Sequence, residues 1–223
     1  MPFAFCLRIL FTLIPHPPTL IPRVKALVTG FEPFGGETVN ASLEAVRRLP
    51  PRIGGLEIET ATLPTSFARA HAALEAAIAR TRPDIVLCIG QAGDRAALCV
   101  ERVAVNVQDA EIADNDGAIP IDAPVVAGGP AAYLATLPAR AAITALHAEK
   151  LPAQLSMSAG TFVCNHVFYG LMHLAAARGH HFRAGFLHVP RLPLQAPDGN
   201  APHMALDDIV RGVRIVLESV AKA

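Results

Sequence analysis

Short apolar runs alternate with longer amphipathic segments along the chain from residue 24 onward. Short apolar or alternating runs are typical of strands, and apolar residues that recur every three to four positions are typical of helices. Strands are predicted over residues 24–29, 56–63, 84–89, 100–107, 153–157 and 185–189. Helices are predicted over residues 42–49, 66–80, 137–149, 163–177 and 204–220. Ser66 is a candidate N-cap for the second helix.

Strands that alternate with helices in this way predict an α/β protein. The expected architecture is a single-domain, three-layer α/β/α sandwich around a largely parallel, mixed central sheet. No repeat of fixed period and no low-complexity linker divides residues 24–223, which we take as one domain. Residues 108–132 are rich in Gly, Pro and Asp and predict a long loop, and loops of that length in compact domains usually have a function.

Residues 1–23 differ from the rest of the chain. They start with an apolar stretch that is too short for a transmembrane helix and end in a proline-rich segment. Arg8 interrupts the apolar part, and no small-residue cleavage site follows it, although a secretory signal remains the alternative. We expect residues 1–23 to be an extension that is not part of the fold.

Composition narrows the range of partners and compartments. The chain is 52% hydrophobic and 17% charged with a net charge of zero and no basic block, so neither nucleic acid nor a membrane is an expected partner. The four cysteines show no paired spacing, which argues against a disulfide framework or a zinc site and favours a reducing, cytoplasmic compartment. The Gly35-Gly36 pair lacks the GxGxxG spacing and no Walker lysine is present, so a nucleotide-binding loop is not expected.

Four stretches are placed to form a site, because ligands of open α/β sheets bind beyond the carboxyl ends of the strands. Residues 30–36 follow the first predicted strand, residues 90–95 follow the third, Cys164 follows the fifth, and His188 lies near the end of the last. If these strands are parallel neighbours, all four stretches meet at one rim of the sheet.

Cys164 lies where a predicted strand passes into a predicted helix. The free N–H groups and the positive end of the dipole at a helix start favour an anion, so a thiol there should have a lowered pKa. The thiolate is the nucleophilic form of cysteine. Cys164 is therefore a candidate nucleophile, and the alternative is a buried residue that acts as a small apolar side chain.

His188 and Glu101 could complete such a site. A thiol and a histidine form a nucleophile–base pair, and a third group usually fixes the imidazole. Glu101 interrupts an apolar, alternating run, where an unpaired carboxylate is costly. The alternatives are a hydrogen-bonded core histidine at 188 and an outward-facing strand charge at 101, paired with Arg102.

Several motifs in this order resemble the pyroglutamyl peptidase I family, also called pyrrolidone-carboxylate peptidases. The longest match reads SAGTFVCNH at residues 158–166, and the last reads GFLHVP at residues 185–190. The other matching segments are residues 27–36 with 39–40, 90–93, 101–104, 114–117, 129–133 and 136–138. The resemblance covers residues 27–208, nearly the whole chain after the extension.

The resemblance implies a cysteine peptidase that removes an N-terminal pyroglutamyl residue from peptides, without a metal or a cofactor. In this reading Cys164 is the nucleophile, His188 is the general base and then the general acid, and Glu101 orients the imidazole. Family members are often dimers or tetramers, so a homodimer or homotetramer is expected.

The resemblance also implies a slot for a flat, neutral lactam ring. A suitable slot is small and apolar, with one donor and one acceptor for the ring amide. The residues that match the slot of the family are Phe31, Phe34, Thr65, Ile112, Phe162 and Val163. Gln91 and Asn40 match the polar contacts of the family.

Three positions depart from the pattern of the family. Glu111 stands where a basic residue is usual, Asp94 where a glycine is usual, and Val100 where a proline is usual. A carboxylate close to Cys164 would oppose thiolate formation. The alternative hypothesis is therefore a catalytically impaired or non-catalytic relative that binds pyroglutamyl-like ligands.

Overall fold

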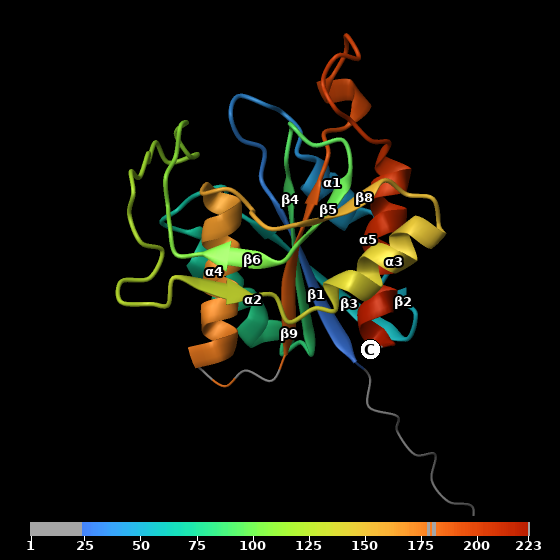
Figure 1. Cartoon of the computed structure of the whole chain (residues 1–223), viewed down its shortest axis with the longest axis horizontal. Helices are drawn as coiled ribbons and strands as arrows, with labels where there is room; N and C mark the ends of the chain where they lie inside the picture. Colours follow the sequence, from blue (N-terminus) through green and yellow to red (C-terminus); the bar gives the residue numbers. More distant parts are fainter. Residues whose placement is uncertain (1–23, 178, 180–181, 223) are drawn as a thin grey trace, which may run out of the picture.

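A central seven-stranded sheet organises the molecule (Figure 1). The computed structural model describes residues 24–177, 179 and 182–222, so the expected extension at residues 1–23 lies outside the described part. The strands follow the order β2-β3-β1-β4-β9-β5-β8. Their bounds are β1 Lys25–Phe31, β2 Arg52–Ile53, β3 Leu56–Leu63, β4 Ile85–Gln91, β5 Leu98–Glu101, β8 Ala153–Ser156 and β9 Arg183–Val189.

The sheet is mixed, as the sequence predicts. Strands β3, β1, β4 and β9 are parallel neighbours. Strand β5 runs antiparallel to β9, and β8 is parallel to β5, so this end of the sheet runs in the opposite direction. The short β2 is antiparallel to β3.

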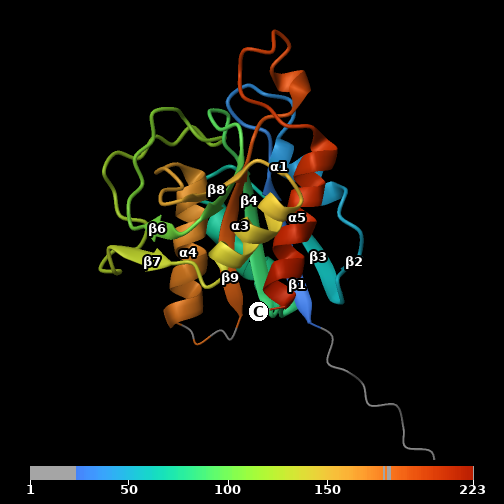
Figure 2. The same ribbon diagram turned by 45° about the vertical axis from the view of Figure 1, so that its right-hand side comes forward.

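Helices cover both faces of the sheet, which confirms the three-layer prediction. Helices α2 and α4 lie on one face, and α1, α3 and α5 lie on the other (Figures 1 and 2). Their bounds are α1 Ala41–Arg47, α2 Ala70–Thr81, α3 Ala139–Ala148, α4 Val163–Ala177 and α5 Leu206–Ala221. A short 3-10 helix, η1, covers Pro193–Gln195. Within the described residues, no helix is long and apolar enough to cross a membrane.

Side-chain alternation along the central strands builds one core on each face of the sheet. On β1, Ala26 and Val28 pack in the core under α1, α3 and α5, whereas Leu27 and Phe31 pack in the core under α2 and α4. Strand β4 is buried along its whole length, as expected for a strand that is covered on both faces. The continuous apolar runs of the sequence therefore become the centre of the sheet.

The predicted strand at 100–107 is wrong, because the chain divides there into two strands of different sheets. Strand β5 ends at Glu101, and β6 (Val103–Val105) pairs with β7 (Ala132–Leu134) in a separate two-stranded sheet. The backbone N–H of Arg102 donates to the carbonyl oxygen of Ser156 at this junction. Alternating polarity continues through the bend, so the pattern alone could not locate it. Strands β2 and β7 and helix η1 are only two or three residues long and leave too few positions for a periodic signal.

Ser66 does not cap α2, which begins four residues later than predicted, at Ala70. The hydroxyl of Ser66 instead accepts a hydrogen bond from the backbone N–H of Arg69 and donates to Asp116. Asp116 also forms an ion pair with Arg69 at 2.7 Å. The Ser66 hydroxyl therefore binds the long loop through Asp116 and does not cap α2.

The predicted loop at 108–132 is confirmed up to its last residue, where β7 begins. Its acidic residues have a structural use. The carboxylate of Asp114 is buried and accepts hydrogen bonds from the backbone N–H groups of Phe67, Asp116 and Ala118. These bonds fold the loop and fasten it to the turn before α2.

Candidate active site

A cavity of about 220 Å³ lies at the carboxyl ends of β1, β4 and β9. It is lined by Phe31, Phe34, Asn40, Thr65, Gln91, Ala92, Asp94, Arg95, Ala159, Gly160, Phe162, Val163, Cys164 and His188. Nine residues expected at the site from the sequence are in this set, and Glu101 is bonded to one of them. Ile112 is the exception: it is 49% exposed on the long loop and does not line the cavity.

Cys164 does not reach the cavity in the way that the sequence suggests. Strand β8, which precedes it, runs opposite to β4 and β9, so its carboxyl end does not share their rim. The loop between β8 and α4 instead carries the chain to the cavity, with Gly160 at a φ of 74° that favours glycine. Cys164 is then the second residue of α4.

Burial dominates the electrostatics of the Cys164 thiol. It raises the pKa of the thiol to about 12, the negative charge of Glu101 adds to this effect, and the positive charge of Arg95 opposes it. The expectation of a lowered pKa is therefore wrong: burial outweighs the favourable position at the helix start. Glu111 is exposed, lies outside the cavity and is not among the charges that act on this thiol.

His188 and Glu101 form a buried hydrogen-bonded pair on adjacent antiparallel strands. The Nδ1 atom of His188 lies 2.8 Å from Oε1 of Glu101, and both side chains are almost completely buried. Because a carboxylate only accepts, His188 donates through Nδ1 and leaves Nε2 for the cavity. The alternative of an outward-facing charge at 101 is thus excluded by the structure.

Arg95 is a further polar member of the site, for which its sequence context predicts no role. Its Nη1 donates to Oε1 of Glu101 at 2.6 Å and to the hydroxyl of Ser156 at 3.2 Å, and its Nη2 donates to the carbonyl oxygen of Ser158 at 2.8 Å. Only the strand pairing of β5 with β8 brings these partners together. A single arginine in a loop gives no signal of that kind.

Aromatic rings form one wall of the cavity. The ring centroids of Phe34 and Phe162 lie 5.9 Å apart, and Phe67 packs edge-on against Phe162 at 5.4 Å. Phe31 and Val163 are buried at the base. The space between these side chains suits a flat, weakly polar group.

The polar residues of the cavity are partly engaged in holding the fold. Asn40 is the N-cap of α1: its Oδ1 accepts from the N–H and hydroxyl of Ser42, and its Nδ2 donates to the carbonyl oxygen of Glu32. The Oε1 of Gln91 accepts from the N–H of Ala41, which leaves its Nε2 group as a donor. Thr65 donates its hydroxyl proton to the carbonyl oxygen of Glu32 and keeps acceptor capacity.

Asn165 fixes the position of α4 next to the nucleophile. Its side-chain amide accepts from the N–H of Val105 and donates to the carbonyl oxygens of Val105 and Val107. This buried amide acts as an additional strand partner for β6. The start of α4 is therefore tied to the chain that follows Glu101.

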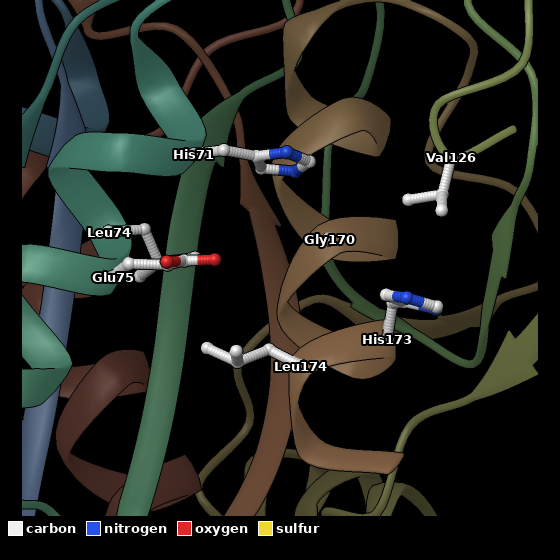
Figure 3. Close-up of a pocket in the computed structure, with 7 residues that line it drawn as sticks. All are labelled: His71, Leu74, Glu75, Val126, Gly170, His173 and Leu174. Carbon is white, nitrogen blue, oxygen red and sulfur yellow. The ribbon is translucent and has the colours of Figure 1, made fainter. Parts of the chain in front are cut away.

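A second, smaller cavity of about 140 Å³ lies over α4 (Figure 3). His71 and Glu75 reach toward it from α2, His173 and Gly170 belong to α4, and Val126 comes from the long loop. None of the residues expected at the active site lines it. Across the part of the chain that the structure describes, no group of three or more His, Cys, Asp or Glu side chains could hold a metal ion.

A thiol at a helix start, an imidazole and a buried carboxylate around one small cavity are the groups of a cysteine-type hydrolase. The chain belongs to the pyroglutamyl peptidase family, whose family model matches residues 24–223.

Close relatives agree with this assignment. Pyrrolidone-carboxylate peptidase 1 of Ralstonia nicotianae is 52% identical over 198 residues, which cover 88% of this chain and 92% of that protein. The pyrrolidone-carboxylate peptidase of Streptomyces coelicolor is 50% identical over 201 residues, which cover 89% of this chain and 92% of that protein.

Solved structures show the same fold. The crystal structure of pyroglutamyl peptidase I from Bacillus amyloliquefaciens has a TM-score of 0.87 at 43% identity, and the match covers 90% of this chain and 98% of that chain. A mutant pyrrolidone carboxyl peptidase from Pyrococcus furiosus has a TM-score of 0.86 at 37% identity, covering 89% of this chain and 99% of that chain.

Proposed function

We propose that the protein removes an N-terminal pyroglutamyl residue from peptides with Cys164 as nucleophile, His188 as general base and acid, and Glu101 as the orienting carboxylate. The observation that carries the assignment is the 2.8 Å bond between His188 and the buried Glu101 in a cavity that also contains Cys164. This bond fixes the tautomer that leaves Nε2 of His188 free to take a proton.

In the first step, the Cys164 thiol passes its proton to Nε2 of His188 as the sulfur forms its bond to the substrate. The sulfur attacks the carbonyl carbon that joins the lactam ring to the next residue, and the carbonyl oxygen becomes an oxyanion. We assign the backbone N–H of Cys164, in the first turn of α4, as a donor to that oxyanion, because the first N–H groups of a helix have no partner within the helix. His188 then protonates the departing amine, and a thioester between Cys164 and the pyroglutamyl group remains.

Hydrolysis of the thioester completes the cycle. His188 removes a proton from water, the resulting hydroxide attacks the thioester carbon, and the proton returns to the sulfur as pyroglutamate leaves. No metal or cofactor takes part in these steps.

The raised pKa of the Cys164 thiol is compatible with these reaction steps. That pKa refers to loss of the proton to solvent, which leaves a thiolate in a site with little access to water. Transfer to His188 instead creates an ion pair, and Glu101 stabilises the imidazolium through the bond to Nδ1. We therefore propose that the resting site holds a neutral thiol, and that proton transfer accompanies the attack.

The cavity provides the chemistry that a lactam ring requires. Phe34 and Phe162 form an apolar slot for the ring, with Phe31 and Val163 at the base. The Nε2 group of Gln91 serves as a donor for the ring carbonyl. A free N-terminal amine would lose its hydration between the phenylalanines, so the slot selects the cyclised residue.

Thr65 and Asn40 complete the polar edge of the slot. The hydroxyl oxygen of Thr65 can accept from the ring N–H, and Asn40 supports the edge as the N-cap of α1. Ile112 would join the slot only if the long loop moved toward the cavity, because it now lies outside.

The non-catalytic alternative is not favoured. It rests on acidic residues near the thiol, and Glu111 is exposed outside the cavity. Asp94 is exposed at the cavity lining, where water screens its charge.

We also propose a reducing, cytoplasmic setting, in which Cys88, Cys99 and Cys164 stay as the free thiols that the structure shows. A homodimer or homotetramer is proposed from the resemblance to the family. Light scattering on a sizing column would test the assembly.

Release of a fluorescent amine from a pyroglutamyl amide tests the function. The wild-type protein should turn over this substrate, and it should not turn over the matching glutamyl and prolyl amides. Cys164→Ala should abolish turnover, whereas Cys88→Ala, which removes a buried thiol on β4, should retain it. A folded wild-type protein without turnover would overturn the proposal.

A further inference from the structure

Arg95 connects the buried carboxylate of the site to the segment that leads into the nucleophile helix. One side of its guanidinium donates to Glu101 at the end of β5, and the other donates to the carbonyl oxygen of Ser158. Nη1 also reaches Ser156 at the end of β8. The planar guanidinium group of an arginine has N–H donors in fixed directions, so it can hold three partners on different elements in one arrangement. The single ammonium group on a flexible lysine side chain cannot do this.

The bond to Glu101 uses the same oxygen that His188 uses. Oε1 accepts from both residues, and Oε2 has no hydrogen-bond partner among the described residues. A fully buried carboxylate that is held through one oxygen depends on both donors for its direction and for compensation of its burial. Without Arg95, the direction of Glu101 would depend on His188 alone.

Arg95 also balances the charge around the thiol. Its positive charge lowers the pKa of Cys164, whereas burial and the negative charge of Glu101 raise it. The other titratable groups that face this region are Cys88 on β4, Cys99 on β5, His188 on β9 and Asp94 on the loop of Arg95 itself. Among the described charges that act on the thiol, Arg95 is the one that favours the thiolate.

We propose that Arg95 is a positioning residue of the peptidase reaction: it fixes the Glu101 carboxylate against His188 and holds the segment before Cys164 to that carboxylate. The inference rests on the proposed function. Arg95 acts on the reacting atoms through Glu101 and the Cys164 segment, not by bond making.

Two substitutions separate the positive charge of Arg95 from the fixed hydrogen-bond geometry of its guanidinium group. Arg95→Met removes both the charge and the donors. Arg95→Lys keeps the charge but not the planar set of donors. Arg102→Met is the matched control, because it removes the same charge next to Glu101 from a residue that does not line the cavity. For each protein, kcat and KM are measured on the pyroglutamyl amide. The rate of Cys164 alkylation by iodoacetamide is measured against pH.

Arg95→Met should lower kcat about a hundredfold with a smaller change in KM, because misplacement of catalytic groups costs about that much. Its alkylation profile should move to higher pH by about one unit, since a nearby cation is lost. Arg95→Lys should keep the wild-type alkylation profile and still lose about tenfold in kcat. Arg102→Met should match the wild type in both measurements.

Wild-type kcat or an unshifted alkylation profile in Arg95→Met would overturn the inference. If Arg95→Met does not fold, wild-type kcat in Arg95→Lys would overturn it. Absence of turnover in the wild type, together with a shifted alkylation profile in Arg95→Met, would reject the proposed function and leave the link between Arg95 and the thiol in place.

Discussion

Gly90 lies directly beneath the Cys164 thiol. A Cβ atom on Gly90 would come within 2.7 Å of the Sγ of Cys164 and within 2.9 Å of the ring of Phe186. Real Cβ atoms do not approach other atoms so closely. The absence of a side chain at the end of β4 therefore makes room for the sulfur.

Gly90→Ala should impair catalysis more than it impairs folding. Overpacking at this point should lower the free energy of unfolding by about 1–3 kcal/mol. Displacement of the sulfur should lower kcat by about tenfold or more. Urea unfolding and turnover of the pyroglutamyl amide measure the two effects.

Gly185→Ala is the control for Gly90→Ala. Its Cβ would meet the side chain of Leu137 at 2.7 Å, away from the thiol. It should lose a similar amount of stability and keep kcat within about threefold. Equal losses of kcat in the two variants would contradict the role of Gly90.

Stability should fall in mild acid because of His166, whose ring stacks on that of His71 with 4.0 Å between centroids. Burial, followed by the charge of His71, lowers the pKa of His166 from 6.5 to about 3. Burial also lowers the pKa of His71. Between pH 6.5 and 3 the unfolded chain binds the proton that folded His166 excludes. The free energy of unfolding should therefore decrease by up to about 1.4 kcal/mol per pH unit for this group as the pH falls.

His166→Phe should flatten that dependence, because it keeps an aromatic ring between His71 and Phe67 and removes the titration. The free energy of unfolding, measured in urea at pH 7.5 and pH 5, should differ less in this variant than in the wild type. His203→Phe alters an exposed histidine and should behave like the wild type. An unchanged pH dependence in His166→Phe would show that other groups cause the loss.

Asn40 should matter for stability through its role as the N-cap of α1. Asn40→Ala removes the acceptor for the N–H of Ser42 and the bond to Glu32, and it should lower the free energy of unfolding by about 1–2 kcal/mol. Asn40→Ser keeps a capping oxygen and should recover part of the loss. A tenfold rise in KM for Asn40→Ser at near wild-type stability would instead show that Asn40 contacts the substrate.

Glu111→Arg should change kcat/KM by less than about threefold, because Glu111 is exposed and outside the cavity. Rates on the pyroglutamyl amide measure this effect. A gain of tenfold or more would show that the long loop brings Glu111 to the thiol during turnover.

Asp94→Asn should act on the leaving residue of the substrate. Asp94 is exposed and lines the cavity, so its charge meets the peptide that extends from the ring. Kinetics on pyroglutamyl peptides should show a rise of about two- to fivefold in kcat/KM when the second residue is acidic and little change when it is neutral. Equal effects on both peptides would exclude a charge effect.

Local patterns were sufficient for most elements of the fold. The bounds of α4 and β3 agree with those predicted, because apolar periodicity starts and stops at glycine, proline or serine signals there. The prediction of a single strand over residues 100–107 was wrong. The alternation in this segment fits one strand, and only pairing with β8 and β7 divides it after Glu101.

The sequence by itself indicated which chemical groups the site could use. Position alone left a structural alternative for Cys164, His188 and Glu101, and the ordered motifs around them, which resemble one family, favoured the catalytic role for each. The tertiary structure decided how they meet. Antiparallel pairing of β5 with β9 brings Glu101 to His188, and the loop after β8 carries Cys164 over Gly90. The tertiary structure also brings Arg95 to Glu101 and leaves Ile112 outside the cavity. These outcomes depend on contacts between residues far apart in the chain, and hydrophobic periodicity holds no information about such contacts.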